Sequence, residues 1–130
     1  MTHHILIADD EPSVLAVLRI FFERQGYGVT TAINGREVVE RGAGILPDLV
    51  ILDIQMPYKT GVEAATELRA DPRYRRVPFV AMTAYVRDYL PSDVLEAGFA
   101  HVLSKPFDLA ELHGVVTALL QSRQRAEGQE

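Results

Sequence analysis

The stretch Leu49-Val50-Ile51-Leu52-Asp53-Ile54-Gln55-Met56-Pro57 opens with four apolar residues and turns polar at Asp53. A short apolar run without alternating polar residues is typical of a strand buried on both faces of a parallel sheet. We therefore predict a strand over residues 49–52 that ends beside Asp53. Comparable runs predict four further strands, over residues 5–8, 29–32, 77–82 and 102–103.

Helical patterns separate these strands. The first helix is predicted to start near Pro12 and to end near Gly26. The second is predicted to start at Asn34 as its N-cap residue, with the Glu37 side chain bonding back to the Asn34 backbone. A third is predicted over residues 61–70, part of a fourth over residues 91–97, and a last one that starts at Asp108. Strict alternation of strands and helices predicts an α/β domain, (βα)5, with a doubly wound five-stranded parallel sheet.

The bulk composition limits the class of protein. The chain has 130 residues, a net charge of −5 and no cysteine, which excludes disulfides and thiol catalysis and fits a cytoplasmic location. We find no signal peptide and no run long enough to cross a membrane. The negative charge argues against direct nucleic-acid binding, and the arginines between 69 and 76 are interpreted as a solvated loop. We expect one domain over residues 1–120 and a frayed polar tail over residues 121–130.

Polar side chains follow four of the predicted strands. They are Asp9, Asp10 and Glu11 after the first, Asp53 after the third, Thr83 after the fourth and Lys105 after the fifth. Ligands of open parallel α/β sheets bind at the carboxyl ends of the strands, so these residues are predicted to share one edge. Clustered carboxylates repel one another unless a cation is present, and oxygen ligands with open water positions suit Mg²⁺.

Such a cluster suits phosphoryl transfer. That reaction needs positioning and charge neutralisation, which a metal, a lysine and a hydroxyl group can supply. The carboxylate of Asp53 could act as the nucleophile and form an acyl phosphate.

Four motifs together resemble the receiver domains of two-component signalling, over roughly residues 5–120. They are Ile7-Ala8-Asp9-Asp10-Glu11-Pro12, Leu52-Asp53-Ile54-Gln55-Met56-Pro57 with Gly61, Thr83-Ala84, and Ser104-Lys105-Pro106-Phe107. The resemblance implies a flavodoxin-like sheet with strand order 2-1-3-4-5. It also implies a phosphoacceptor signalling domain rather than an enzyme. Its partners would be a sensor histidine kinase or histidine phosphotransfer protein and a downstream target protein.

The resemblance also implies residue roles. Asp53 would be the phosphoacceptor, with Thr83 and Lys105 contacting the phosphoryl oxygens. Asp10 would bind Mg²⁺ directly, Asp9 would act through water, and the backbone carbonyl of Gln55 would be a further ligand. The peptide bond between Lys105 and Pro106 would be cis. Partners would use the face of the fourth helix, fifth strand and fifth helix, with Leu90, Val94, His101 and His113 at its edges.

One position departs from the family. Receivers usually carry an aromatic residue three positions before the lysine, and here that position is Val102. Two explanations are open: the signal travels through the loop after Thr83, where Tyr85 and Tyr89 are available, or the domain acts mainly as a phosphate sink. We favour the loop, with Tyr85 taking over part of the coupling. Gln55 and Tyr85 would also tune the lifetime of the acyl phosphate.

Other interpretations compete with this one. The main alternative is a pseudo-receiver, the same fold used as a binding module without phosphorylation. An aspartate-nucleophile phosphatase is disfavoured because Gln55 stands where its second aspartate belongs, and a flavodoxin-like cofactor carrier because no glycine loop follows the first strand. Asp9 and Asp10 could instead cap a helix, Thr83 could reflect strand propensity, and Lys105 could be a surface residue. The four histidines show no ligand spacing and are interpreted as surface or packing residues.

Overall fold

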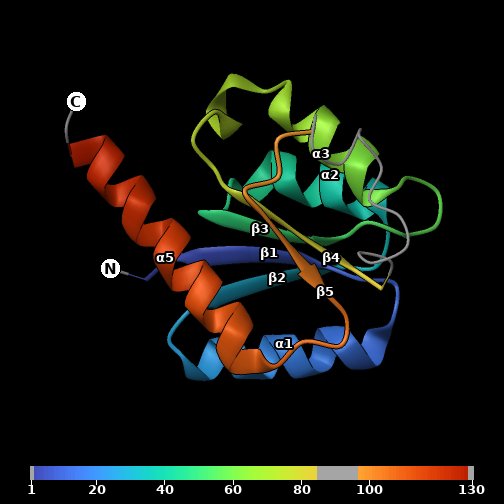
Figure 1. Cartoon of the computed structure of the whole chain (residues 1–130). Helices are drawn as coiled ribbons and strands as arrows, with labels where there is room; N and C mark the ends of the chain where they lie inside the picture. Colours follow the sequence, from blue (N-terminus) through green and yellow to red (C-terminus); the bar gives the residue numbers. More distant parts are fainter. Residues whose placement is uncertain (1, 85–96, 129–130) are drawn as a thin grey trace.

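The computed structural model of the chain describes residues 2–84 and 97–128 (Figure 1). Its sheet is parallel, with strand order β2-β1-β3-β4-β5, as the resemblance implied. The strands are β1 (His4–Ala8), β2 (Gly28–Ala32), β3 (Leu49–Asp53), β4 (Phe79–Thr83) and β5 (His101–Ser104). The predicted strands are confirmed, although β4 begins two residues later than expected and includes Thr83.

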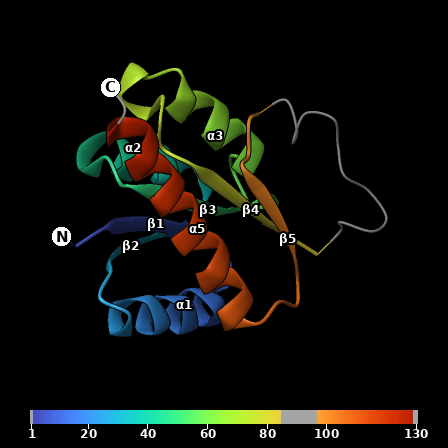
Figure 2. The same ribbon diagram turned by 60° about the vertical axis from the view of Figure 1, so that its left-hand side comes forward.

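Helices cover both faces of the sheet, as predicted. They are α1 (Pro12–Arg24), α2 (Gly35–Ile45), α3 (Gly61–Arg69), the 3₁₀ helix η1 (Pro72–Tyr74) and α5 (Leu109–Gly128). Figures 1 and 2 show α1 and α5 on one face and α2 and α3 on the other. Residues 91–96 of the helix predicted over residues 91–97 lie outside the described residues, and residue 97 lies in a turn. None of the described helices is both long and apolar enough to span a bilayer.

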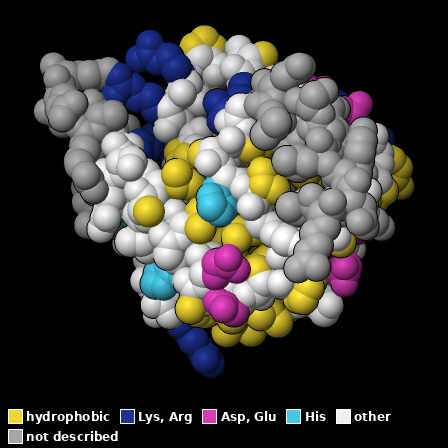
Figure 3. All heavy atoms as spheres, in the orientation of Figure 1, with side chains coloured by type: hydrophobic (Ala, Val, Ile, Leu, Met, Phe, Trp, Pro, Cys, Tyr) yellow, Lys and Arg dark blue, Asp and Glu magenta, His cyan; other side chains and the backbone are white. Residues whose placement is uncertain are grey.

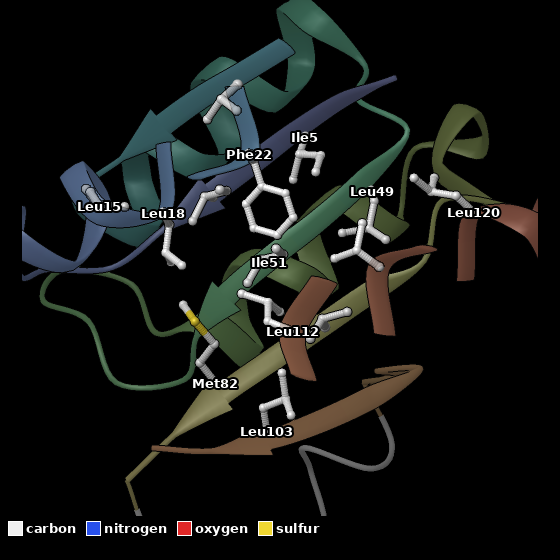
Figure 4. Packing of buried hydrophobic residues seen from close by; sticks show 14 residues of the cluster. Ile5, Leu15, Leu18, Phe22, Leu49, Ile51, Met82, Leu103, Leu112 and Leu120 are labelled. Atoms are coloured by element: carbon white, nitrogen blue, oxygen red, sulfur yellow. The ribbon is translucent and has the colours of Figure 1, made fainter. Parts of the chain in front are cut away.

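Side chains of each inner strand alternate between two apolar layers. Ile5 and Ile7 of β1 pack in the layer with α1 and α5, whereas Leu6 and Ala8 pack in the layer with α2 and α3. Figure 4 shows the first layer, where Phe22 of α1 points toward Ile5 and other strand residues. Since both layers exclude water, both sets of strand positions are apolar, which explains the continuous runs in the sequence.

Local signals fix the helix ends. Pro12 opens α1, and Gly26 follows the helix with a φ of 93°. Asn34 caps α2 by accepting a hydrogen bond from the Glu37 N–H at 2.9 Å. The Glu37 side chain does not return to Asn34 but accepts the N–H of Ile33 at 3.1 Å.

Two polar segments can be compared with their interpretation from the sequence. The residues after Leu120, predicted to be a frayed tail, continue helix α5 to Gly128, and Arg123 donates a hydrogen bond to the Asp48 carbonyl at 2.7 Å. Arg69 is not a solvated loop residue, since its guanidinium lies over the Phe79 ring at 4.4 Å and donates to the Gly98 carbonyl at 2.8 Å.

Candidate functional site

The carboxyl ends of four strands bring the predicted site residues to one edge of the sheet. Ala8 pairs with Leu52, so Asp9 and Asp53, which follow them, are neighbours across β1 and β3. On the other side, Thr83 of β4 pairs with Ser104 of β5. The N–H of Lys105, the residue after β5, donates to the Thr83 carbonyl at 2.8 Å, which places the lysine beside the end of β4.

Lys105 links two carboxylates that are far apart in the sequence. Its Nζ lies 2.6 Å from Oδ2 of Asp9 and 2.9 Å from Oδ2 of Asp53. Asp9 is fully buried, and Asp53 and Thr83 are almost fully buried. Burial strengthens both ion pairs because little water is available to screen them. Lys105 is therefore part of the site and not a free surface lysine.

Backbone amides orient the same two carboxylates. Oδ1 of Asp9 accepts the N–H of Glu11, and Oδ1 of Asp53 accepts the N–H of Gln55, each at 2.9 Å. Each side chain thus bonds the backbone two residues ahead through one oxygen and faces Lys105 with the other. This arrangement fixes the direction of both Oδ2 atoms before any ligand arrives.

The environment shifts the ionisation of the central pair. Burial raises the pKa of Asp53, and the charge of Asp9 adds to the rise, whereas hydrogen bonds from Lys105 and from the Gln55 N–H oppose it. Burial alone would lower the pKa of Lys105, but its contacts with Asp9 and Asp53 outweigh burial and raise that pKa. The lysine therefore remains a cation beside a carboxylate in a poorly solvated position.

Three carboxylates can together hold a metal ion. Within the described residues, Asp9, Asp10 and Asp53 each offer one oxygen, and these oxygens lie within 4.8 Å of one another. Asp10 is exposed, unlike Asp9 and Asp53. Hard oxygen ligands that reach water on one side fit Mg²⁺, which keeps several of its waters in proteins.

The helix-cap alternative for Asp9 and Asp10 is wrong. The N-cap residue of α1 is Glu11, whose side chain makes no capping hydrogen bond. The histidines serve in packing and surface contacts: His113 meets the rings of Phe21 and Phe22 edge to face. On the face drawn in Figure 3, histidine side chains lie apart from one another.

The proposed switch positions are only partly described. The bond between Lys105 and Pro106 is cis, as the resemblance implied. Val102 packs against a small cluster formed by Ile54 and Ala81, and Phe99 packs against the same cluster. Tyr85, Tyr89, Leu90 and Val94 lie outside the described residues.

A surface cleft opens beside the acidic cluster. It has a volume of about 650 Å³ and lies between α1 and the segment that leads from β5 to α5. Lys105 and Glu11 stand at its polar side, and Val14, Val17 and Phe107 form much of its apolar lining. The site therefore adjoins a cleft with a largely apolar lining.

Sequence reasoning missed several features that shape the site. Thr60 and Glu63 form a complete capping box at the start of α3, a signal that is visible in the sequence. The loop after Asp53 is oriented by this capping box and by a hydrogen bond from the Gly61 N–H to the Ile54 carbonyl at 2.9 Å. A side chain at Gly61 would not fit, since its Cβ would lie 2.3 Å from the Asp53 carbonyl oxygen.

Comparison of the sequence with known families and proteins gives a consistent result. The family model of the response regulator receiver domain matches residues 5–117. Regulatory protein AtoC of Escherichia coli (strain K12) is 39% identical over 119 residues, which make up 92% of this chain and 25% of AtoC. Transcriptional regulatory protein PrrA of Mycobacterium leprae (strain TN) is 40% identical over 119 residues, or 92% of this chain and 50% of PrrA. The chain thus spans a quarter to a half of these relatives.

Solved structures resemble the chain over nearly its whole length. The receiver domain of sensor histidine kinase PA1611 from Pseudomonas aeruginosa PAO1, which has a magnesium ion coordinated in its active site cleft, superposes with a TM-score of 0.86 at 30% identity. The match covers 93% of this chain and 99% of that one. Chemotaxis protein CheY4 of Vibrio cholerae superposes with a TM-score of 0.84 at 25% identity, covering 92% of this chain and 99% of that one.

Proposed function

Because this chain belongs to the response regulator receiver domain family, we propose that Asp53 accepts a phosphoryl group in a Mg²⁺-dependent reaction. The donor is a histidine kinase or a histidine phosphotransfer protein, and the product binds a target protein differently from the unmodified chain. The observation that carries this proposal is the arrangement of Asp53, whose carboxylate is ion-paired with Lys105 at 2.9 Å beside two further aspartates.

In the proposed reaction an Oδ atom of Asp53 forms the new bond to phosphorus. The bond between phosphorus and the leaving group breaks, and its electron pair stays with the leaving group, which is the histidine nitrogen of the donor protein. Lys105 balances negative charge that gathers on the phosphoryl oxygens, and the hydroxyl of Thr83 donates a hydrogen bond to one of them. Positioning and charge neutralisation are the main demands of this chemistry.

The carboxylates of Asp10 and Asp53 and the backbone carbonyl of Gln55 would hold Mg²⁺, with Asp9 acting through water. The ion supplies positive charge that neutralises the phosphoryl oxygens. Support comes from the hard oxygen donors, from their separation of at most 4.8 Å for the three side chains, and from the magnesium ion in the cleft of the PA1611 receiver domain. Asp10, the exposed member, is the ligand with the easiest access to a hydrated ion.

Receiver domains are signalling domains, so the consequence of phosphorylation lies in partner binding. We propose that the signal leaves through the loop after Thr83, with Tyr85 in part of the role that an aromatic ring at position 102 has in relatives. A change in target affinity requires that Thr83 and Lys105 contact the phosphoryl group better in one conformation than in the other. Tyr85→Ala should therefore weaken the phosphorylation dependence of target binding.

The test is the mass of the intact protein after incubation with Mg²⁺ and acetyl phosphate. We expect one phosphoryl adduct that disappears with a metal chelator and in Asp53→Asn. Asp71→Asn is the matched control, because Asp71 pairs with Arg73 away from the site, and it should be modified like the wild type. A folded wild-type protein that gains no adduct with any of several small donors would refute the proposal and favour the pseudo-receiver.

A further inference from the structure

Strand β2 is the outermost strand on one side of the sheet, and part of its backbone faces away from β1. The Gly28 N–H donates to the His3 carbonyl at 2.9 Å, and the Ala32 carbonyl accepts the Asp9 N–H at 3.2 Å. The N–H and C=O of one residue in a strand point to the same side, and the side alternates along the chain. The backbone groups of Val29 and Thr31 therefore point outward, where another strand could pair with them.

Arginines from the two neighbouring helices occupy this outer edge. Arg19 of α1 donates a hydrogen bond to the Val29 carbonyl at 3.4 Å, and Arg41 of α2 donates one to the Thr31 carbonyl. The two helices lie on opposite faces of the sheet (Figure 2). The edge is thus covered from both faces, with one guanidinium group on each of these two outward carbonyls.

Each arginine is also held on its own helix. Arg19 lies 4.0 Å from the carboxylate of Glu23, and Arg41 lies 3.5 Å from that of Glu37, in both cases one helical turn away. A guanidinium group has five N–H donors in one plane, so it can contact a carboxylate and a carbonyl together. The glutamates thus give each arginine a second contact on its own helix, beside its contact with the strand.

The sequence of the strand explains why such cover matters. Residues 27–33 contain no charged residue and no proline, and four of the seven are β-branched. Uncharged segments with high strand propensity pair readily with other strands, and natural edge strands are protected by charges or prolines in the strand, by bulges, by short length or by a covering element. A groove of about 360 Å³, lined partly by Arg19, Ile20 and Thr31, adds apolar surface beside this edge.

We infer that Arg19 and Arg41 block the β2 edge against pairing with β2 of a second copy of this chain. A second copy is the partner that fits, because two β2 edges related by a twofold axis offer each other the same outward N–H and C=O groups. In the native chain both outward carbonyls are already engaged. Two copies that approached through this edge would also bring four guanidinium groups together.

The test compares the self-association of Arg19→Gln/Arg41→Gln with that of the wild type by sedimentation velocity over a range of concentrations. Glutamine keeps a good helix former at both positions. Arg24→Gln/Arg75→Gln is the matched control, since it changes the net charge equally at two exposed positions and leaves Arg19 and Arg41 on the outward carbonyls of β2. We expect the weight-average mass of the edge variant to approach twice that of one chain, while the control stays like the wild type.

Hydrogen exchange identifies the surface involved. Pairing through β2 should slow amide exchange in residues 27–33 of the edge variant as its concentration rises. The inference is wrong if the folded edge variant does not associate beyond the wild type, if the charge control associates equally, or if association leaves exchange in residues 27–33 unchanged. If the double variant does not fold, the single variants Arg19→Gln and Arg41→Gln are tested by the same criteria. Each is then expected to associate partially.

Discussion

Replacement of Lys105 by methionine should strongly destabilise the metal-free protein. Lys105 is the cation in contact with both Asp9 and Asp53, and Asp9 has no exposed surface. Removal of one partner from a fully buried ion pair costs about 3–5 kcal/mol, because the other charge is left buried without compensation. Since 20% of the lysine side chain is exposed, we expect a smaller loss of about 2–3 kcal/mol in the free energy of unfolding.

The chain offers a matched control, because its only other lysine is Lys59. Lys59 pairs with Glu67, and both side chains are substantially exposed, so Lys59→Met should cost less than about 1 kcal/mol. Unfolding is followed with urea by far-ultraviolet circular dichroism, since the chain has no tryptophan. All proteins are measured in a chelator at neutral pH.

Magnesium provides the second half of the experiment. The lysine and a bound cation neutralise the same carboxylates, so Lys105→Met should gain more stability from added Mg²⁺ than the wild type does. A ligand that binds only the folded state stabilises it in proportion to the logarithm of its concentration above the dissociation constant. The reasoning is refuted if Lys105→Met and Lys59→Met lose equal stability in chelator. It is also refuted if added Mg²⁺ stabilises the wild type at least as much as it stabilises Lys105→Met.

Three further predictions concern the core and the last helix. Tyr74→Phe should lose about 1–2 kcal/mol at neutral pH, because the Gly42 carbonyl loses its hydrogen bond from the phenol at 2.6 Å. Burial raises the pKa of Tyr74 to about 12, so the stability from its neutral form is complete below pH 10 and is lost as pH rises to 12. The difference between wild type and variant should therefore shrink over that range in urea titrations, and a constant difference would contradict this account. Gly42→Ala should destabilise by about 1–3 kcal/mol, because its Cβ would lie 2.7 Å from the phenol oxygen. Gly44→Ala should instead stabilise the same helix by about 0.5–1 kcal/mol, because its Cβ would meet no atom within 4 Å beyond its own stretch of helix; equal melting temperatures of the two variants would count against this. Arg123→Ala should speed amide exchange in residues 120–124, and unchanged exchange would show that its contact with Asp48 does not hold α5.

The sequence alone predicts the fold because its signals are local. Runs such as residues 5–8 and 49–52 are apolar at every position, which indicates that both faces of the strand are buried. The polar residues after these runs mark one edge of the sheet. The resemblance adds the strand order, which no local pattern contains. The site residues accordingly lie where expected, with Asp9, Asp53, Thr83 and Lys105 at adjacent strand ends.

What the sequence does not reveal depends on contacts between distant residues. Asp9 and Asp10 are chemically identical neighbours, yet the first is buried against Lys105 and the second is exposed. The polar composition after Leu120 predicts a frayed tail, and it does not reveal the hydrogen bond from Arg123 to the Asp48 carbonyl. The arginine-rich composition of residues 69–76 likewise predicts a solvated loop, and only the fold places the Phe79 ring beneath the Arg69 guanidinium.

The loop between β3 and α3 is closed at its base and exposed to solvent at its tip. The Gly61 N–H is bonded to the Ile54 carbonyl, while Tyr58 at the tip is 77% exposed. Because the chain contains neither cysteine nor tryptophan, a single cysteine at position 58 would carry a fluorescent label at one defined place. Such a labelled protein would report optically on events at the neighbouring aspartate in real time, with the anchored base keeping the dye from disturbing the sheet.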